Sequence, residues 1–229
     1  MRHPGISDTR EPDQAAAVEE IAREFREGFA QLARIDRPAV TIFGASRVRE
    51  GHPAYESARK VGRSFGARGW AVVTGGGPGV MEAANRGAQE AGGLSVGFNI
   101  HLPHEQRANP YLDISYTFEH FYVRKVCFVK PAEGFVIFSG GFGTLDELYE
   151  TLTLIQTGKV THFPVVLFGI DSWSGMLDWL RREPLAGEMI SPEDVAVIHL
   201  TDDPEDAVEV VVAAYERRVA HDAATAAGL

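Results

Sequence analysis

The stretch FSGGFGTLDE, residues 138 to 147, holds the residues whose types and spacing most clearly suggest chemistry. An apolar run ends there in three glycines and a threonine, and Asp146 and Glu147 follow directly behind them. Glycine-rich turns let backbone amides approach an oxyanion closely, and a helix N-terminus adds to that attraction. If this turn binds a ligand, the two carboxylates beside it indicate one that is more than a simple anion.

A purely structural interpretation of the same stretch is a helix cap. Thr144 and Glu147 have the T-x-x-E spacing of a capping box. The buried face of that helix would carry Leu145, Leu148, Leu152 and Ile155. A capping box needs no glycines, so the group Gly140, Gly141 and Gly143 favours a ligand site.

A second glycine-rich stretch, TGGGPGVMEAANRGA, spans residues 74 to 88. A helix beginning at Pro78 or Gly79 would point its amide dipoles at a ligand. The same glycines could instead form only a tight turn between strand and helix, and both interpretations stay open. No G-x-G-x-x-G follows the first strand and no Gly-Lys-Ser/Thr is present, which argues against an NAD enzyme and an ATPase.

Other polar groups lie in two further segments. FEHFYVRKVCFVK carries Arg124 and Lys125 in an otherwise apolar helical pattern, where they could also be a solvated basic edge. IHLPHEQ carries His101, His104 and Glu105, but Pro103 breaks the helix that a paired-histidine zinc motif needs. We therefore expect no metal site.

The elements that position these groups alternate between short apolar runs and helical patterns. Strands are predicted at 39–44, 70–75, 94–99, 134–140, 164–169 and 195–200, and helices at 15–32, 54–68, 79–91, 120–131, 143–156, 173–182 and 204–218. Apolar strands separated by helices indicate a parallel sheet covered on both faces. The predicted fold is α/β, a three-layer Rossmann-like doubly wound sheet, whose ligands bind outside the carboxyl ends of the strands.

Composition limits the remaining possibilities. The chain has 229 residues, 45% of them apolar, which is enough to bury one sizeable core. We expect a polar segment and helix at 1–36, one domain at 37–218 and a flexible tail at 219–229. A formal charge of -10 gives no general attraction to nucleic acid or anionic membranes. The single cysteine, Cys127, is predicted to be a small buried hydrophobic residue. No signal peptide or membrane span is evident, which predicts a cytoplasmic protein.

Together the motifs GGGPGVMEAANRGA, LPHEQ, RK and GGFGTLDE resemble those of the LOG (Lonely Guy) family, over about residues 40 to 180. The family hallmark P-G-G-x-G-T-x-x-E is matched from Gly140 to Glu147, with Ser139 in the usual proline position. The residues before Arg124 are FYV, where familiar members have Met-His and a polar residue. This departure leaves the base preference open.

The resemblance implies a Rossmann-like phosphoribohydrolase that releases free bases from cytokinin riboside 5'-monophosphates, and often from AMP. It implies that Arg124 and Glu147 are the catalytic pair. It implies a homodimer. The helix at 15–32 could add contacts for a larger homo-oligomer or simply cap the domain, and both interpretations stay open. Nucleotide contacts are implied for Glu105, Lys125, Thr153 and the turn formed by Gly140, Gly141, Phe142, Gly143, Thr144, Leu145 and Asp146.

Cleavage of an N-glycosidic bond passes through an oxocarbenium-like transition state that a carboxylate can stabilise. We expect Gly141, Gly143 and Thr144 to hold the 5'-phosphate and Glu147 to face the ribose. The role of Arg124, towards phosphate, ribose or departing base, stays open. Ser46 and the loop containing Gly76, Gly77 and Gly79 would complete the pocket, with Met81 and Glu82 nearer the base.

Two other functions compete with this one. The first is a general purine or pyrimidine nucleotide 5'-monophosphate nucleosidase, and the second is a non-catalytic carrier of molybdenum cofactor or nucleotide. Members of the family have also been labelled lysine decarboxylases, which need pyridoxal phosphate on a lysine. None of the four lysines, Lys60, Lys125, Lys130 and Lys159, has a recognisable cofactor setting. No cofactor is expected.

Overall fold

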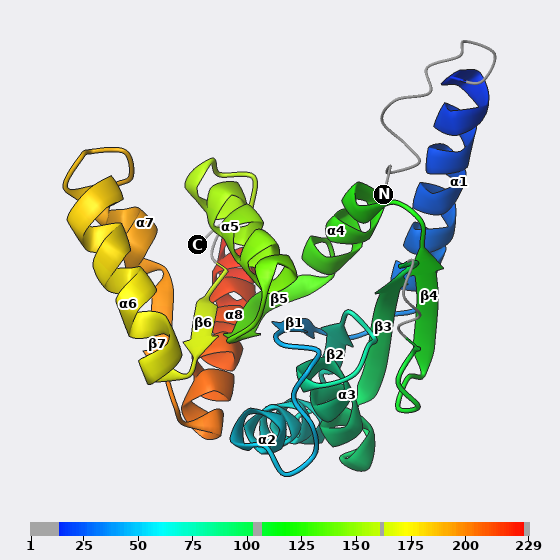
Figure 1. Cartoon of the computed structure of the whole chain (residues 1–229), viewed down its shortest axis with the longest axis horizontal. Coiled ribbons are helices and arrows are strands. Elements are labelled where there is room, and N and C mark those ends of the chain that lie inside the picture. The colour runs from blue at the N-terminus through cyan, green and yellow to red at the C-terminus, as the bar shows by residue number, and fades with distance from the viewer. Residues whose placement is uncertain (1–13, 103–106, 161–162, 227–229) are drawn as a thin grey trace.

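One parallel sheet organises the chain. The computed structural model describes residues 14–102, 107–160 and 163–226, and those residues include seven strands in the order β4-β3-β2-β1-β5-β6-β7 (Figure 1). Every neighbouring pair is parallel. The strands are β1 (Ala39–Phe43), β2 (Ala71–Thr74), β3 (Leu94–Ile100), β4 (Ile114–Phe118), β5 (Ala132–Phe138), β6 (Val165–Phe168) and β7 (Ile198–Thr201). The predicted doubly wound α/β fold is confirmed.

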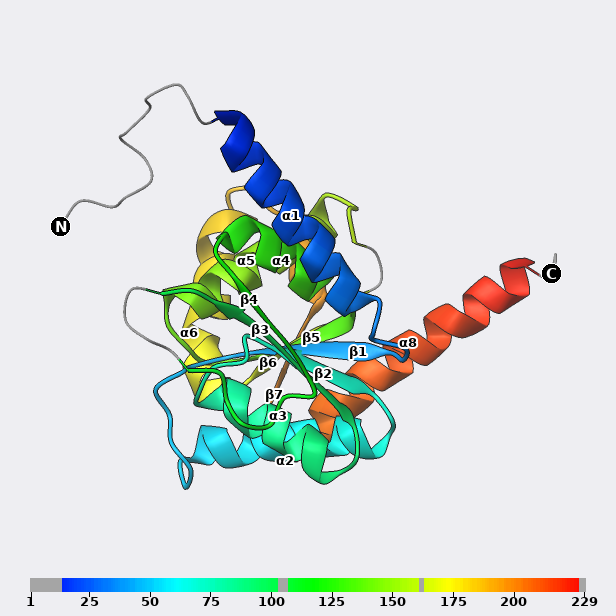
Figure 2. The same cartoon turned by 90° about the vertical axis from the view of Figure 1, so that its right-hand side faces the viewer.

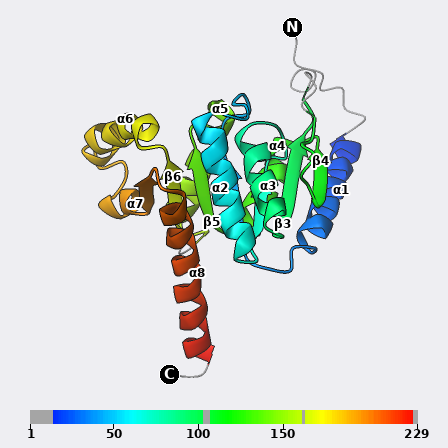
Figure 3. The same cartoon turned by 90° about the horizontal axis from the view of Figure 1, so that it is seen from below.

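Helices cover both faces of the sheet, as Figures 1 and 3 show. One face packs against α1 (Gln14–Leu32), α4 (Phe121–Val129), α5 (Phe142–Gln156) and α6 (Ile170–Leu180). The other packs against α2 (Pro53–Ala67), α3 (Val80–Glu90) and α8 (Pro204–Ala226). A short α7 (Pro192–Ala196) precedes β7, and a π-helical turn, Arg181–Leu185, extends α6.

The alternation of side chains along each strand builds two separate cores. On β1, Val40 and Ile42 face the α2 and α3 side, whereas Ala39 and Phe43 face the α4 and α5 side. All five residues of β1 are buried. A strand buried on both faces lacks polar alternation, which explains the continuous apolar run in the sequence.

The strand order reverses next to β1. β2, β3 and β4 lie on one side of β1, and β5, β6 and β7 lie on the other. The loops after β1 and β5 are joined by a hydrogen bond from the Ala45 amide to the Ser139 carbonyl, 3.1 Å long. Such a reversal leaves a crevice at the carboxyl ends of the strands, which is where this class of sheet binds ligands.

Two predicted elements differ from the structure on the sheet edges. β4 was not predicted, because this edge strand alternates buried Ile114 and Phe118 with exposed Ser115 and Thr117 instead of forming an apolar run. The strand predicted at 195–200 begins only at Ile198. Residues 195 and 196 end α7, which a Ser191 capping box and Pro192 initiate.

Two helices, α6 and α8, extend beyond one of their predicted ends. α6 begins at Ile170 rather than 173, and α8 continues to Ala226 rather than 218, so most of the expected tail is helical. Figure 2 shows this last part of α8 projecting from the body. Residues 1–13 lie outside the described residues, and the three-part domain division stays a prediction. Across the described ranges, no helix combines the length and apolarity that crossing a membrane requires.

Candidate active site

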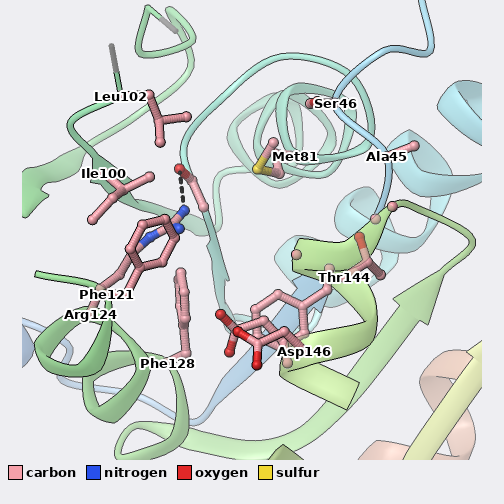
Figure 4. Close-up of a pocket in the computed structure, with 16 residues that line it drawn as sticks. Ala45, Ser46, Met81, Ile100, Leu102, Phe121, Arg124, Phe128, Thr144 and Asp146 are labelled. Carbon is pink, nitrogen blue, oxygen red and sulfur yellow. Dashed lines mark hydrogen bonds between the residues drawn. The ribbon is translucent and has the colours of Figure 1, made fainter. Parts of the chain in front are cut away.

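A pocket of about 310 Å³ opens at the strand-order reversal. The loops after β1 and β2, the start of α3, the end of β3, one side of α4 and the first two turns of α5 form its walls. Its lining residues are Phe43, Gly44, Ala45, Ser46, Gly75, Met81, Ile100, Leu102, Phe121, Arg124, Phe128, Gly141, Gly143, Thr144, Asp146 and Glu147. In Figure 4, Phe121, Arg124 and Phe128 of α4 face Thr144 and Asp146 of α5 across the opening.

The α5 side of the pocket begins with Gly141 as N-cap, without a capping side chain. A Cβ at Gly141 or Gly143 would meet nothing within 4 Å, so both positions are open on the side where a side chain would project. The hydroxyl of Thr144 occupies the place that a Cβ at Gly140 would take. Gly140 is therefore needed for packing, whereas Gly141 and Gly143 leave room for a ligand at the helix N-terminus.

The helix start decides against the capping-box interpretation. Because α5 begins at Phe142, Thr144 is the third helical residue and Glu147 lies in the second turn. Neither residue occupies the position that a capping box needs. The capping-box alternative is wrong, and its two polar side chains both line the pocket instead.

Arg124 is half-buried, and main-chain carbonyls hold its guanidinium. Its Nε donates to the carbonyl of Phe98 at 2.6 Å and its Nη2 to that of Gly75 at 3.4 Å. Its Cζ lies 4.8 Å from the centre of the Phe128 ring, beside which Figure 4 shows it. Burial lowers the pKa of Arg124 to about 10, against the opposing effect of Glu147. The guanidinium therefore stays charged at neutral pH and keeps further N–H donors for the pocket.

Glu147 is the buried acid of the site. Its side chain belongs to a residue only 8% exposed, and no described residue donates a hydrogen bond to its carboxylate. Burial raises the pKa of Glu147 to about 7, although the charges of Lys125 and Arg124 oppose the rise. A carboxyl that titrates near neutral pH can accept or return a proton during a reaction.

Lys125 lies outside the pocket wall, next to Arg124 on α4. Its Nζ lies 2.9 Å from a carboxylate oxygen of Asp146 and 3.3 Å from one of Glu150. Burial alone would lower the pKa of Lys125, but its acidic neighbours raise it above the ordinary value. A Schiff-base lysine needs a lowered pKa, so Lys125 does not fit the pyridoxal phosphate chemistry of a decarboxylase.

Several predicted contact residues lie away from the pocket lining. Glu82 accepts a hydrogen bond from the Tyr55 hydroxyl at 2.9 Å, and the Thr153 hydroxyl donates to the Tyr149 carbonyl. Phe142 is 92% exposed, and Leu145 packs against the core. Also outside the lining are Gly76, Gly77, Gly79, Lys125 and Gly140, whereas Glu105 falls outside the described residues.

The residues missed by sequence reasoning are mainly apolar. Ile100, Leu102, Phe121 and Phe128 line one side of the pocket, and Gly75 supports Arg124 from behind. Their residue types match those of an ordinary core, so no local pattern distinguishes them. Only Ile100 and Leu102 had a usable signal, their position at the carboxyl end of β3.

The remaining polar clusters are occupied by other partners. The Nδ1 of His101 lies 3.0 Å from the Glu119 carboxylate, and His104 falls outside the described residues. Within the described part of the chain, no three His, Cys, Asp or Glu side chains are grouped as metal ligands. Cys127 is fully buried, which confirms its predicted role, and burial raises the pKa of its thiol to about 12.

Comparison with known proteins adds sequence evidence to this geometry. A family model described as "possible lysine decarboxylase" matches residues 81–211. A Mycobacterium marinum protein named cytokinin riboside 5'-monophosphate phosphoribohydrolase is 34% identical over 134 residues, which are 57% of this chain and 72% of the relative. An Escherichia coli K12 pyrimidine/purine nucleotide 5'-monophosphate nucleosidase is 31% identical over 140 residues, 57% of this chain and 30% of that protein.

Solved structures share the same architecture. The molybdenum cofactor carrier protein of Chlamydomonas reinhardtii superposes with a TM-score of 0.59 at 23% identity, covering 79% of this chain and 99% of that chain. At this identity the likeness concerns the fold. The pocket and its charged pair therefore have to be interpreted from their own geometry.

Proposed function

The chain belongs to the LOG family, whose model matches more than half of it, and from this premise we propose that it hydrolyses nucleoside 5'-monophosphates to free base and ribose 5-phosphate. It is an enzyme of the N-glycosyl hydrolase class, as the names of its curated relatives indicate. The proposed substrates include AMP and cytokinin riboside 5'-monophosphates. No cofactor enters the proposed reaction.

One observation carries the proposal. The half-buried Arg124 and the buried Glu147 lie in one pocket, beside a helix N-terminus that no side chain caps. The three features match the three chemical demands of a 5'-nucleotide: an anion, a sugar that becomes cationic, and a departing base. A carrier protein would have no use for an unpaired buried acid, whose desolvation is costly.

The proposed phosphate position is the start of α5. Gly141 and Gly143 leave open space there, and the amides of the first turn point out of the helix. The adjacent Thr144 hydroxyl lines the same wall. Because the helix needs no side-chain cap when an anion is bound, this arrangement suits a phosphate better than an empty turn.

The proposed ribose position lies one turn further along α5, in front of Glu147. As the bond between the base and C1' breaks, positive charge develops on C1' and the ring oxygen. The Glu147 carboxylate would stabilise this charge, orient the ribose hydroxyls or take a proton from the attacking water. A pKa of about 7 makes both protonation states available at neutral pH.

The proposed hydrolysis balances with the nucleotide and water as its only reactants. Water supplies a hydroxyl group to C1' and a proton that replaces the ribosyl group on the base nitrogen. Arg124 would stabilise the negative charge on the phosphate or on the departing base with the donors that Phe98 and Gly75 do not use. Its burial makes those hydrogen bonds stronger than they would be in water.

The proposed base position is the apolar side of the pocket, near Ile100, Leu102 and Phe121. Apolar side chains can stack on a base or contact an N6 substituent, but they cannot read the hydrogen-bonding edge of the base. This observation favours a broad substrate range, so a general purine and pyrimidine nucleotide nucleosidase is the second candidate. A panel of nucleoside 5'-monophosphates, with and without N6-isopentenyl, distinguishes the two.

We also propose that the enzyme is a cytoplasmic homodimer, with a larger homo-oligomer as the alternative. Support comes from apolar side chains that α1, α4 and α5 leave exposed: Phe29, Phe121, Tyr122, Val126 and Tyr149. Large apolar side chains exposed on helices that lie on the same face of the sheet are typical of a protein interface. Light scattering coupled to size-exclusion chromatography measures the mass directly.

Glu147→Ala tests the proposed function when free base and ribose 5-phosphate are measured with AMP as substrate. Loss of Glu147 should lower kcat by at least about a hundredfold, because the charge at C1' loses its stabilising partner. Glu133→Ala serves as the control. Glu133 lies at the amino end of β5, away from the carboxyl ends that form the pocket, and pairs with Arg218 of α8. Wild-type turnover in Glu147→Ala would rule out this catalytic role, and no base release by the wild type from any nucleotide would rule out the function.

A further inference from the structure

Glu24 is a buried acid of α1 that the proposed reaction does not use. The residue is 1% exposed. Its carboxylate accepts hydrogen bonds from the Glu119 amide at 2.6 Å and from the His120 amide at 3.2 Å, and it lies 3.0 Å from Nδ1 of His120. α1 lies beside β4 and α4 in Figures 1 and 2, so one α1 side chain reaches the junction between those two elements.

This junction determines where α4 begins. Only Glu119 and His120 separate the end of β4 from the start of α4, and Glu24 binds the amides of both. His120 is the N-cap of α4, yet its own side chain makes no capping hydrogen bond. The carboxylate from α1 thus supplies the anionic group that a helix N-terminus favours.

The first turn of α4 carries two pocket residues. Phe121 follows His120 directly, and the Arg124 amide donates to the His120 carbonyl at 3.3 Å. A displacement of His120 therefore moves the backbone of Arg124 with it. The guanidinium end of Arg124 is fixed by Phe98 and Gly75, so Glu24 constrains the opposite end of the same residue.

Other contacts dock α1 independently of Glu24. The Tyr116 hydroxyl donates to Glu27, one turn further along α1, at 2.5 Å. A Cβ at Gly28 would stand only 3.0 Å from Cys127 Sγ and from the Phe118 ring, so α1 approaches β4 and α4 closely there. Loss of the Glu24 carboxylate alone should leave α1 in place while it releases the start of α4.

We propose that Glu24 is a positioning residue for Arg124, and that α1 is therefore part of the catalytic unit. This inference rests on the proposed function for its effect on turnover. Glu24 touches neither substrate nor reacting atoms. It acts through the backbone of residues 119 and 120, whose charge-assisted hydrogen bonds to a buried carboxylate are stronger than neutral ones.

The experiment compares Glu24→Ala, Glu24→Gln and the control Glu27→Ala in the full chain. In Glu24→Ala, kcat with saturating AMP should fall about tenfold, since small misplacements of a reacting group are costly. Glu24→Gln keeps one carbonyl acceptor, so it should recover part of that loss. Glu27→Ala removes a contact of the same helix that does not reach α4, and should keep kcat near the wild-type value.

Hydrogen exchange gives a readout that does not depend on activity. Amides at 119–124 should lose protection in Glu24→Ala and keep it in Glu27→Ala. Equal kcat in Glu24→Ala and wild type, or an equal fall in both alanine variants at matched folded fraction, would overturn the positioning role. If the wild type releases no base at all, the proposed function fails. Exchange at 119–124 then decides alone: unchanged protection in Glu24→Ala overturns the inference, and selective loss supports it.

Discussion

The guanidinium of Arg124 occupies the space in front of Gly75 where any other residue would place its side chain. A Cβ at position 75 would stand 2.5 Å from Nη2 of Arg124 and 2.7 Å from Sδ of Met81. The carbonyl of Gly75 also accepts a hydrogen bond from the same Nη2. The glycine run after β2 is thus needed for the close approach of an arginine from α4, and not only for a turn.

Gly75→Ala should consequently displace Arg124 without unfolding the protein. Both obstacles are ends of flexible side chains, so the free energy of unfolding should fall by only about 1 kcal/mol. Base release from AMP should fall about tenfold in kcat/KM, because the guanidinium leaves its position. Gly175→Ala is the matched control, since a Cβ there meets nothing within 4 Å. Wild-type kcat/KM in Gly75→Ala would contradict this account.

Neighbouring glycines before α5 should separate stability from phosphate binding. Gly140→Ala places a Cβ against the Thr144 side chain, so it should lower the free energy of unfolding by about 1–3 kcal/mol. Gly141→Ala meets no atom within 4 Å, so the fold should persist. Its methyl group would project into the open space at the helix start, where the phosphate is proposed to bind.

The measurement for this pair is KM for AMP beside the melting temperature. KM should rise about tenfold in Gly141→Ala, the scale of one charge-assisted hydrogen bond, while the melting temperature stays near that of the wild type. Adenosine lacks the phosphate, so its weaker binding should not change. An unchanged KM for AMP would show that the phosphate does not bind at the start of α5.

The sequence predicts the buried centre of this fold better than its edges. β1 and β5 are buried on both faces, so their apolar runs are unmistakable. β4 lies at an edge and shows only alternation, and α7 depends on the local capping chemistry of Ser191. Edge elements carry weaker hydrophobic signals because fewer of their side chains are covered.

The site is likewise divided into residues that the sequence predicts and residues whose roles depend on tertiary contacts. Arg124 and Glu147 lie in the first two turns of helices that follow strand ends, and the structure brings them to one pocket. The sequence cannot tell that Gly140 serves packing while Gly141 faces open space, because both have the same residue type and differ only in tertiary contacts. Glu24 has no local signal for the same reason, as its partners lie more than ninety residues away.

The burial of Glu147 should make stability depend on pH. Its pKa is raised from the ordinary 4.5 to about 7, so the folded state holds this proton more tightly than the unfolded state. The stabilisation is fully present below the unfolded pKa and is lost as pH rises through about 7. Glu147→Gln stays neutral at every pH and should avoid this loss.

Relative to the wild type, Glu147→Gln should therefore gain free energy of unfolding between about pH 4 and pH 8, by up to about 3 kcal/mol. Denaturant titrations at the two ends of this range measure the difference. Glu150→Gln, one turn further along α5, is the control for a more exposed carboxyl. A constant difference between Glu147→Gln and the wild type would show that the carboxyl titrates normally.

Arg124→Lys tests whether the site needs only a positive charge or the planar guanidinium. A lysine keeps the charge but cannot donate to both Phe98 and Gly75 from a fixed fork, nor stack on the Phe128 ring in the same way. We expect kcat/KM for AMP to fall about a hundredfold, which is the scale for losing one preorganised hydrogen-bond donor. Arg124→Met, which removes the charge at similar length, sets the lower limit of activity.

If charge alone mattered, Arg124→Lys would retain nearly all activity and only Arg124→Met would be inactive. If geometry matters as proposed, the lysine variant lies close to the methionine variant, because a cation that is free to move in the pocket no longer meets the departing base or the phosphate at a defined angle.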